Sequence, residues 1–367
     1  MVEVNIVKRL GNFSLDLSLN LQKDLTVLFG PSGSGKSVAL QTIAGWMEPD
    51  SGTIRLNGLV YFNKEKGVNL PIHRRHIGYV LQEPSLFPHM TLFENIAYGA
   101  SGLPAGERKR KVWQMIERMR LQGLENHFPA QISGGQKQRG ALARALVASP
   151  LLFLLDEPFA SLDNPVREKL RLDLLKIRKE DNIPFIFVTH DVDEAFVVAE
   201  EIVVLNEGRV EQRGSKEDIF YRPQTHSVAR FLGAKNIFRG RITEIRPEKG
   251  EMKAWVEEKG FEAVIPCRKG ALVGEEILFC IRPEEIMILK PGKPIKPNLQ
   301  ANIFTGEIVR IVERGAEHTL FFRRGMDDYD FEISLSNLAY RSLRLREGDK
   351  ASVAFKWESI WVIPQKE

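Results

Sequence analysis

The stretch Leu25-Thr26-Val27-Leu28-Phe29-Gly30-Pro31-Ser32-Gly33-Ser34-Gly35-Lys36-Ser37 decides the fold of the first part of this chain. It begins with a short apolar run typical of a buried strand and continues through a glycine-rich loop of the form G-x-x-x-x-G-K-[ST]. The helix-forming run 38–44 follows. A phosphate-binding loop requires this strand–loop–helix order. Glycines let successive backbone N–H groups point at phosphate oxygens, and the helix start adds the positive end of its dipole.

The loop therefore predicts a nucleotide site with ATP and Mg²⁺ as cofactors. Lys36 supplies a point charge for the β- and γ-phosphates, and Ser37 offers a hydroxyl to Mg²⁺. The residues expected to contact the nucleotide here are Gly30, Pro31, Ser32, Gly33, Ser34, Gly35, Lys36, Ser37 and Val38.

Two adjacent acids, Asp156 and Glu157, end a second apolar run at Leu151–Leu155. Successive residues of a strand point to opposite sides, so the two carboxylates can serve different tasks. We expect Asp156 to reach Mg²⁺, through water, because Mg²⁺ keeps part of its hydration shell. Glu157 would then polarise the attacking water as a general base.

A second anion-binding helix start is predicted at Ile132-Ser133-Gly134-Gly135-Gln136, ahead of the helix-forming run Lys137–Val147. Ser133 is a suitable helix N-cap, and the two glycines leave backbone N–H groups unobstructed. One loop cannot wrap both sides of the same γ-phosphate within a monomer. A head-to-tail homodimer, in which Ser133, Gly134, Gly135 and Gln136 close over the partner's ATP, solves this problem.

Length and composition are those of an ordinary globular protein with more than one domain. The 367 residues are 43% apolar and 27% charged, which excludes a disordered chain. The net charge of +4 is too small for a dedicated nucleic-acid binder. Two cysteines, Cys267 and Cys280, cannot form a disulfide framework and favour a reducing compartment. No apolar run reaches the roughly 20 residues that a membrane-spanning helix needs.

The pattern of apolar runs divides the chain near residue 233. Before it, short apolar runs alternate with helical stretches, which predicts a mostly parallel sheet flanked by helices. After it, short alternating runs separated by glycines predict an all-β region over 234–367. Asn236-Ile237-Phe238-Arg239-Gly240-Arg241-Ile242 is echoed by Asn302-Ile303-Phe304-Thr305-Gly306-Glu307-Ile308, which favours two tandem β units at about 235–290 and 298–367. A proline-rich segment, 291–297, would join them.

Taken together, the motifs of the first 233 residues resemble those of the ATP-binding-cassette (ABC) ATPases. The motifs that carry the resemblance are, in chain order, Gly30 to Ser37, Gln82, Ile132 to Gln136, Leu151 to Glu157, Ala160 to Asp163, and His190. The resemblance implies an α/β P-loop domain over 1–233 with a helical subdomain at about 84–148, and ATP hydrolysis coupled to transport.

Within that resemblance, Gln82 is similar to the glutamine that senses Mg²⁺ and the membrane subunit. Asp163 is similar to the acid that communicates between the two ATP sites. His190 is similar to the switch histidine that contacts the γ-phosphate and positions water. The aromatic that stacks on adenine has no clear counterpart; Phe13 is the nearest candidate.

The absence of membrane helices in the chain favours an importer. The resemblance then implies a homodimer bound to two integral-membrane permease subunits, with an external solute-binding protein, on the cytoplasmic face of the membrane. Gly214 to Pro223, Phe231 to Gly233 and Arg282 to Glu285, with the all-β tail, resemble importers that carry a C-terminal OB-like regulatory domain of the TOBE or Mop type. That tail has no basic aromatic stripe, so no nucleic-acid partner is expected.

The sequence is most similar to molybdate importer ATPases, through the compact start Leu10 to Leu15 and the stretch Lys66 to Tyr79. Sulfate or thiosulfate, ferric iron, polyamines and sugars remain open as solutes. The oxyanion-binding motif usual in molybdate-binding tails, Ser-Ala-Arg-Asn, is replaced by Gly233-Ala234-Lys235-Asn236, which lacks the bidentate arginine. The alternative from another class is a soluble ABC ATPase that acts on DNA or ribosomes.

Overall fold

The computed structural model describes residues 1–21, 25–290, 292 and 294–364. The chain divides into two compact units, Met1–Lys216 and Glu217–Glu367. The sequence pattern predicts that the second region begins at residue 234, whereas the second unit begins at Glu217. The reason is apolar packing, because Ala229 and Ala234 share a small buried cluster with Cys280 and Ile363. Pro291 and Lys293 of the proline-rich segment lie outside the described residues.

One sheet runs through the described part of the first unit, in the strand order β6-β5-β4-β1-β2-β11-β10-β3-β9-β8-β7. Its strands are β1 (Val2–Leu10), β2 (Phe13–Leu21), β3 (Leu25–Phe29), β4 (Ser51–Leu56), β5 (Leu59–Asn63), β6 (Val68–Asn69), β7 (Ile77–Val80), β8 (Leu152–Asp156), β9 (Phe185–Thr189), β10 (Glu201–Asn206) and β11 (Arg209–Gly214).

The expectation of a mostly parallel sheet is wrong for the half β6-β5-β4-β1-β2, where neighbouring strands pair antiparallel, and for β10 with β11. Strands β2 and β11 pair in parallel. Strands β3, β8 and β9 are buried at every residue and pair in parallel, as continuous apolar runs predict. In β2, by contrast, Leu15, Leu17, Leu19 and Leu21 are buried and the residues between them are exposed. That alternation suits an antiparallel strand with one covered face, and β2 pairs antiparallel with β1.

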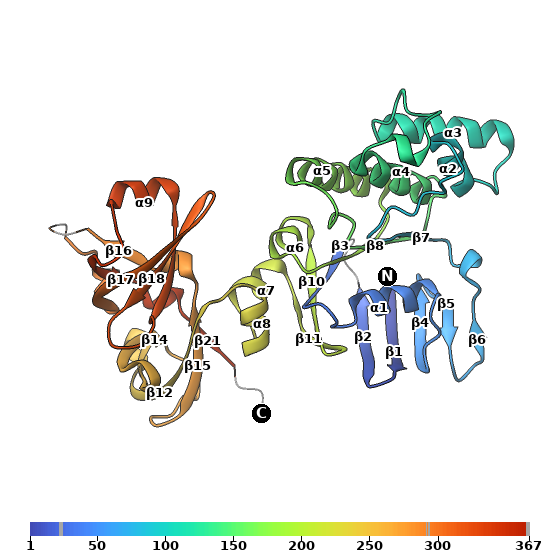
Figure 1. Cartoon of the computed structure of the whole chain (residues 1–367). Coiled ribbons are helices and arrows are strands. Elements are labelled where there is room, and N and C mark those ends of the chain that lie inside the picture. The colour runs from blue at the N-terminus through green and yellow to red at the C-terminus, as the bar shows by residue number, and fades with distance from the viewer. Residues whose placement is uncertain (22–24, 291, 293, 365–367) are drawn as a thin grey trace. The chain divides into compact units, whose positions relative to one another are not determined.

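Helices of the first unit form two groups. Helix α1 (Lys36–Ala44) follows β3, and α6 (Val192–Val198) follows β9. Helices α2 (Leu92–Gly99), α3 (Ala105–Arg118), α4 (Gly134–Leu146) and α5 (Asn164–Asp181) gather on one side of the unit (Figure 1). Short 3-10 turns lie at η1 (Ile72–Arg74) and η2 (Pro129–Gln131). The helical group has an apolar inner face, since Val112, Ile116 and Met119 are buried.

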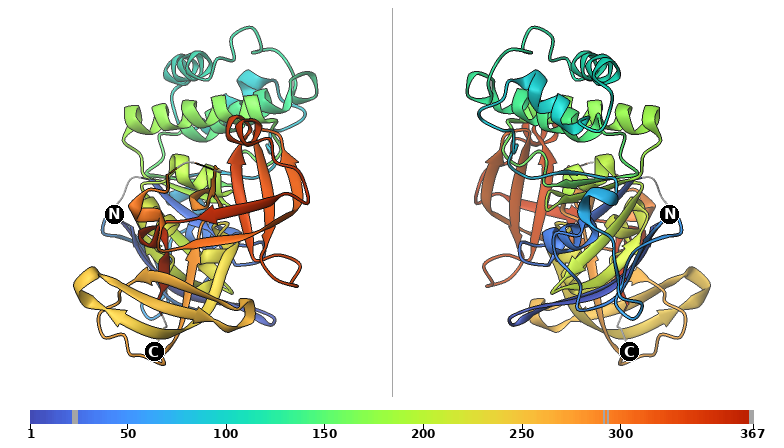
Figure 2. Two further views of the ribbon diagram at one scale, coloured as in Figure 1. Left: turned by 90° about the vertical axis from the view of Figure 1, so that its left-hand side faces the viewer. Right: turned by 90° about the vertical axis from the view of Figure 1, so that its right-hand side faces the viewer.

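The described part of the second unit contains two five-stranded sheets (Figure 2). The first sheet has the order β14-β13-β12-β15-β21 and the second the order β16-β20-β17-β18-β19. The strands are β12 (Asn236–Arg246), β13 (Glu251–Val256), β14 (Phe261–Pro266), β15 (Glu276–Ile281), β16 (Met287–Leu289), β17 (Ile303–Arg314), β18 (Glu317–Arg323), β19 (Phe331–Ser336), β20 (Lys350–Ala354) and β21 (Trp361–Ile363).

The remaining elements of the second unit are helical. They are α7 (Lys216–Tyr221), which begins one residue before the unit boundary, α8 (His226–Phe231), α9 (Asn337–Leu343), η3 (Pro247–Lys249), η4 (Glu257–Lys259), η5 (Pro283–Glu285), η6 (Pro297–Leu299) and η7 (Trp357–Ser359). Helix α9 corrects the expectation that 234–367 is all-β. Ser336 starts this helix, because its hydroxyl accepts a hydrogen bond from the Ala339 N–H at 3.3 Å.

The two sheets have equivalent strand orders when one of them is read in reverse. Each sheet receives one edge strand from the part of the chain that forms the other sheet. Strand β16 follows β15 but pairs with β20, and β21 follows β20 but pairs with β15. The echoed asparagines occupy equivalent places. Asn236 makes two hydrogen bonds to the backbone of Glu332 in the second sheet, at 2.7 and 2.9 Å. Asn302 makes two to the backbone of Val264 in the first sheet, at 2.8 Å each.

Candidate nucleotide site

Parallel strands of the first unit deliver the candidate residues to one edge of the sheet. Strand β3 leads into the phosphate loop, β8 ends at Asp156, β9 ends just before His190, and β7 ends two residues before Gln82. These four strands are consecutive neighbours in the sheet. The carboxyl ends of parallel strands are where open α/β sheets bind ligands.

The phosphate loop needs glycine at two places for different reasons. A Cβ on Gly30 would lie 2.1 Å from the backbone oxygen of Leu205, so no side chain fits. Gly35 has a φ of 100°, which L side chains rarely adopt, and it directly precedes α1. The loop therefore keeps its backbone close to β10 and presents the start of α1, as the motif predicts.

Lys36 lies inside the loop and is 5% exposed. Its Nζ donates hydrogen bonds to the carbonyl oxygens of Gly30 at 2.9 Å and Pro31 at 2.8 Å. Burial lowers the pKa of Lys36, and the nearby carboxylates of Glu157 and Asp156 oppose that shift. The ammonium is thus positioned within the loop, where it can meet phosphate oxygens.

Asp156 is 7% exposed and receives two hydrogen bonds. The Ser37 hydroxyl donates to its Oδ1 at 2.9 Å and the Tyr79 hydroxyl to its Oδ2 at 3.1 Å. Burial raises the pKa of Asp156, whereas these two donors lower it. The Tyr79 ring stacks on Trp46, with ring centroids 4.5 Å apart. Sequence reasoning missed Tyr79, since nothing in the chain marks the contact of a tyrosine with an acid far along the sequence.

Glu157 and His190 form a close pair, with the Nδ1 of His190 3.0 Å from Oε1 of Glu157. Glu157 has a φ of 44°, and its N–H donates to the carbonyl of Val188 at 3.1 Å. This turned backbone lies directly after β8, so Asp156 and Glu157 have different partners. Their separate environments agree with the different tasks expected of them.

Gln82 and Asp163 are both exposed. Asp163 is the N-cap residue of α5, although its side chain makes no capping hydrogen bond. Ser133 is the N-cap of α4: the Gln136 N–H donates to its hydroxyl at 3.4 Å, and its own N–H donates to Gln136 Oε1 at 2.8 Å. Within the described residues, no hydrogen bond or ion pair joins the segment 133–136 to the phosphate loop.

A cavity of about 920 Å³ lies against the outer side of the phosphate loop. Pro31, Ser32, Gly33 and Ser34 form one wall, and Phe13 and Arg209 contribute to the others. The Phe13 ring is packed close to the loop, because a Cβ on Gly35 would come within 2.8 Å of its Cζ atom. The Phe13 ring therefore packs against the phosphate loop at Gly35.

Comparison with known proteins decides the family. A family described as ABC transporter matches residues 13–160. The chain is 36% identical to a sulfate/thiosulfate import ATP-binding protein, CysA 2, of Shewanella oneidensis, over 97% of this chain and 96% of that protein. The chain belongs to the ATPase subunits of ABC importers. It is also 35% identical to a spermidine/putrescine import ATP-binding protein, PotA, of Rubrobacter xylanophilus, over 96% of this chain and 90% of that protein.

Solved ABC cassettes agree with the fold of the first unit. A dimeric post-hydrolysis state of the cassette MJ0796, bound to ADP and Pi, is 30% identical with a TM-score of 0.51 and covers 59% of this chain and 99% of that one. The predicted α/β P-loop fold and the resemblance to ABC ATPases are confirmed, as are ATP and Mg²⁺ as cofactors. No helix among the described residues is long and apolar enough to span a membrane.

The residues present fit Mg²⁺ with ATP. A hydroxyl and a carboxylate oxygen are the hard oxygen ligands that Mg²⁺ prefers, and Ser37 and Asp156 bring them within 2.9 Å of each other beside Lys36.

Proposed function

We propose that this chain hydrolyses ATP as the energy-coupling subunit of a membrane importer, working as a homodimer on the cytoplasmic face of the membrane. The observation that carries the proposal is the Ser37–Asp156 hydrogen bond beside the Glu157–His190 pair, all at the end of the phosphate-loop sheet. Two permease subunits and an external solute-binding protein are the expected partners.

The residues of the site divide the chemistry. Backbone N–H groups of residues 33–38 and the Lys36 ammonium bind the phosphates. Ser37 and Asp156 would hold Mg²⁺, Asp156 through water, and the bound ion would neutralise charge on the β- and γ-phosphates. Glu157 accepts a proton from the attacking water, and His190, in contact with Glu157, orients that water and meets the γ-phosphate. Gln82 is proposed to report the occupied site to the permease.

The homodimer supplies the missing side of the γ-phosphate. Ser133, Gly134, Gly135 and Gln136 begin α4, whose N-terminal N–H groups and dipole favour an anion. Because both Ser133 and Gly134 are exposed, the helix start is available to a second copy. Asp163, at the start of α5, is proposed to connect the two ATP sites.

Two inactive variants test this trans arrangement when they are mixed. Lys36→Ala removes phosphate binding and Ser133→Arg blocks the composite face, so each alone should be inactive. A hybrid dimer keeps one intact pairing, and a mixture should regain activity above both parents. If hybrids form but no mixture exceeds its parents, each chain does not complete its partner's site.

The transported solute is proposed to be a tetrahedral divalent oxyanion, molybdate or tungstate, with sulfate or thiosulfate sharing the same chemistry. Support comes from the residues 10–15 and 66–79 for molybdate and from the CysA relative for sulfate. The PotA relative favours polyamines as the second candidate. The second unit is proposed to be a regulatory domain of the TOBE or Mop type, on the strength of its two equivalent sheets.

Reconstitution with a permease distinguishes these solutes. The chain and the permease subunits are placed in proteoliposomes, and ATPase activity is measured with solute-binding proteins loaded in turn with molybdate, sulfate and spermidine. Stimulation by an oxyanion-loaded protein supports the first candidate. Stimulation only by the spermidine-loaded protein would replace it with the second. Recovery of the dimer on ribosomes or DNA, without a permease, would contradict the importer role.

A further inference from the structure

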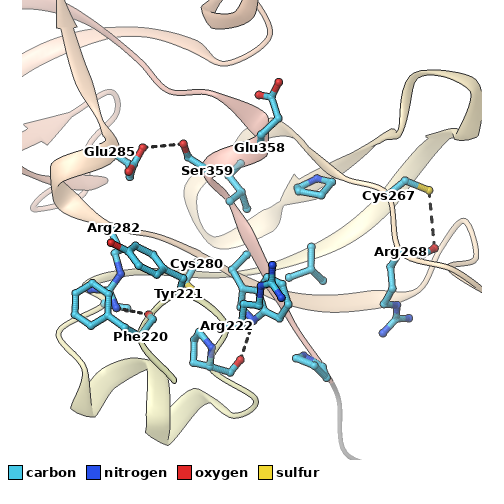
Figure 3. A pocket seen from close by; sticks show the side chains of 17 residues that line it. Phe220, Tyr221, Arg222, Cys267, Arg268, Cys280, Arg282, Glu285, Glu358 and Ser359 are labelled. Atoms are coloured by element: carbon cyan, nitrogen blue, oxygen red, sulfur yellow. Dashed lines mark hydrogen bonds between the residues drawn. The ribbon is translucent and has the colours of Figure 1, made fainter. Parts of the chain in front are cut away.

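A cavity of about 630 Å³ lies within the second unit and contains none of the residues assigned to ATP (Figure 3). One wall is the segment Phe220–Pro223, which ends α7, and the opposite wall includes β21 and the residues around β15. Aromatic and proline side chains form part of its surface, among them Tyr221, Trp361 and Pro266.

Trp361 and Arg282 hold the segment 220–223 beside the sheet. The Trp361 Nε1–H donates to the carbonyl of Pro223 at 2.8 Å. The Arg282 guanidinium lies 3.3 Å from the ring centroid of Phe220 and donates to the carbonyls of Phe220 and Leu232. The cavity is therefore formed by ordered contacts and not by a loose loop.

Charged groups of both signs line this apolar space. The guanidinium groups of Arg222, Arg268 and Arg282 and the carboxylates of Glu285 and Glu358 belong to its lining. In the close view, Glu285 and Glu358 lie along one side and the three arginines along the other (Figure 3). The Nε of Arg268 is buried and has no hydrogen-bond partner within the part of the chain that the structure describes.

The arginines do not make the cavity a site for a dianion. Each has an acidic neighbour: Asp218 lies 3.6 Å from Arg222, Glu284 lies 3.9 Å from Arg282, and Glu275 is bonded to Arg268. The surplus positive charge that would bind sulfate, phosphate or molybdate is therefore absent from this lining. Hydrogen-bond donors remain, since a guanidinium carries five N–H groups.

The equivalent positions of the other sheet show that the fold does not require these side chains. Strand register makes Arg282 equivalent to Lys356, Trp361 to Met287, and Arg268 to Ser336. The second sheet forms with Lys356, Met287 and Ser336 at these positions. Arg268, Arg282 and Trp361 are therefore specific to the first sheet and are not required by the fold.

We propose that this cavity binds a small zwitterion with an apolar body, the chemical class of the larger apolar α-amino acids. The carboxylate of the ligand meets Arg268, the ammonium meets Glu358, and the side chain lies against Trp361 and Tyr221. A ligand that carries both charges can use both kinds of charged group in the lining, and the aromatic walls remove apolar surface from water. ATP hydrolysis uses none of these residues, so the site adds to the proposed function.

Isothermal titration of the full-length protein tests the ligand class. L-Leucine, L-phenylalanine and L-tryptophan are titrated beside three matched probes: 3-phenylpropionate, which lacks the ammonium, 2-phenylethylamine, which lacks the carboxylate, and sodium sulfate. At least one amino acid should bind with a Kd of about 1 mM or tighter. Both one-charge analogues should bind at least about tenfold more weakly, because each leaves one set of charges without a partner.

Two variants of the cavity lining test whether the amino acid binds in this cavity. Arg268→Gln and Glu358→Gln should each weaken binding by about tenfold, whereas Lys356→Gln, at the position equivalent to Arg282 but outside the cavity lining, should leave it unchanged. Undiminished ATP binding and an unchanged circular dichroism spectrum check folding. The proposal is overturned if no amino acid binds, or if a one-charge analogue or sulfate binds as tightly as the amino acid does. It is also overturned if both lining variants bind the amino acid with wild-type affinity.

Discussion

Replacing Tyr79 with phenylalanine removes one hydroxyl from the metal site and leaves the aromatic ring. In the wild type this hydroxyl donates to Asp156 Oδ2 at 3.1 Å while Ser37 donates to Oδ1 at 2.9 Å. The ring should keep its place, because its stacking on Trp46 does not depend on the hydroxyl. The variant therefore isolates one hydrogen bond to the carboxylate proposed to hold Mg²⁺.

The expected loss of metal affinity follows from the negative charge of the Asp156 carboxylate, which accepts the hydrogen bond. A hydrogen bond to an ionised group contributes about 1.5–3 kcal/mol, and the low end applies because Ser37 still holds the other oxygen. About 1.4 kcal/mol corresponds to a tenfold change in affinity. Burial already raises the pKa of Asp156, and the Tyr79 donor opposes that rise. Without the donor the pKa rises further, so protons compete better with Mg²⁺ as the pH falls.

Mn²⁺ binding, followed by electron paramagnetic resonance with a non-hydrolysable ATP analogue, measures this effect without turnover. The half-saturating metal concentration should rise about tenfold in Tyr79→Phe, and by more at low pH than at high pH. Turnover at saturating Mg²⁺ should fall much less. Tyr61→Phe is the matched control, since the Tyr61 hydroxyl donates to the backbone of Arg75 and not to an acid. Unchanged metal affinity in Tyr79→Phe, or an equal loss in Tyr61→Phe, would show that the Tyr79 hydroxyl does not support the metal site.

Three further perturbations follow from the described contacts. Glu157→Gln should keep ATP binding and lower turnover by at least about 10²-fold, leaving a dimer that retains ATP on a sizing column; near wild-type hydrolysis would exclude Glu157 as the base. Asn302→Ala leaves the half-buried N–H and C=O of Val264 without the Asn302 side chain, at a cost of about 1–3 kcal/mol in the unfolding free energy of the second unit, measured by urea titration; an unchanged midpoint would contradict this. Deletion of residues 235–367 should spare ATP binding, because every residue assigned to ATP precedes it; loss of binding of a fluorescent ATP analogue would show that the second unit supports the first.

The centre of the first unit could be predicted from the sequence because its strands are continuous apolar runs. The apolar runs 25–29 and 151–155 were predicted as strands and correspond to β3 and β8, and the loop predicted between a strand and a helix lies between β3 and α1. The antiparallel half was missed. Its alternating residues mark a half-buried strand, but alternation alone does not say which neighbour such a strand pairs with.

The contacts between residues of the site were harder to predict than the site residues themselves. The motifs named Ser37 and Asp156, but only the folded chain shows that Tyr79 reaches the same carboxylate. In the second unit, the echo around Asn236 and Asn302 could be seen in the sequence, whereas their bonds to strands of the opposite sheet could not. Contacts between residues distant in sequence depend on packing, which a local pattern does not encode. The roles of Ser133 and Asp163 stay predictions, since they concern a second copy.

The exchanged last strands of the two sheets have a consequence for biosynthesis. All the strands of the first unit have been made once Gly214 leaves the ribosome, so that unit can fold while the rest of the chain is still being translated. The first sheet of the second unit must wait for Trp361–Ile363, because these residues supply its edge next to β15. The nascent chain therefore carries an uncovered strand edge through most of the synthesis of the second unit, and this is the interval in which a chaperone would protect it from aggregation.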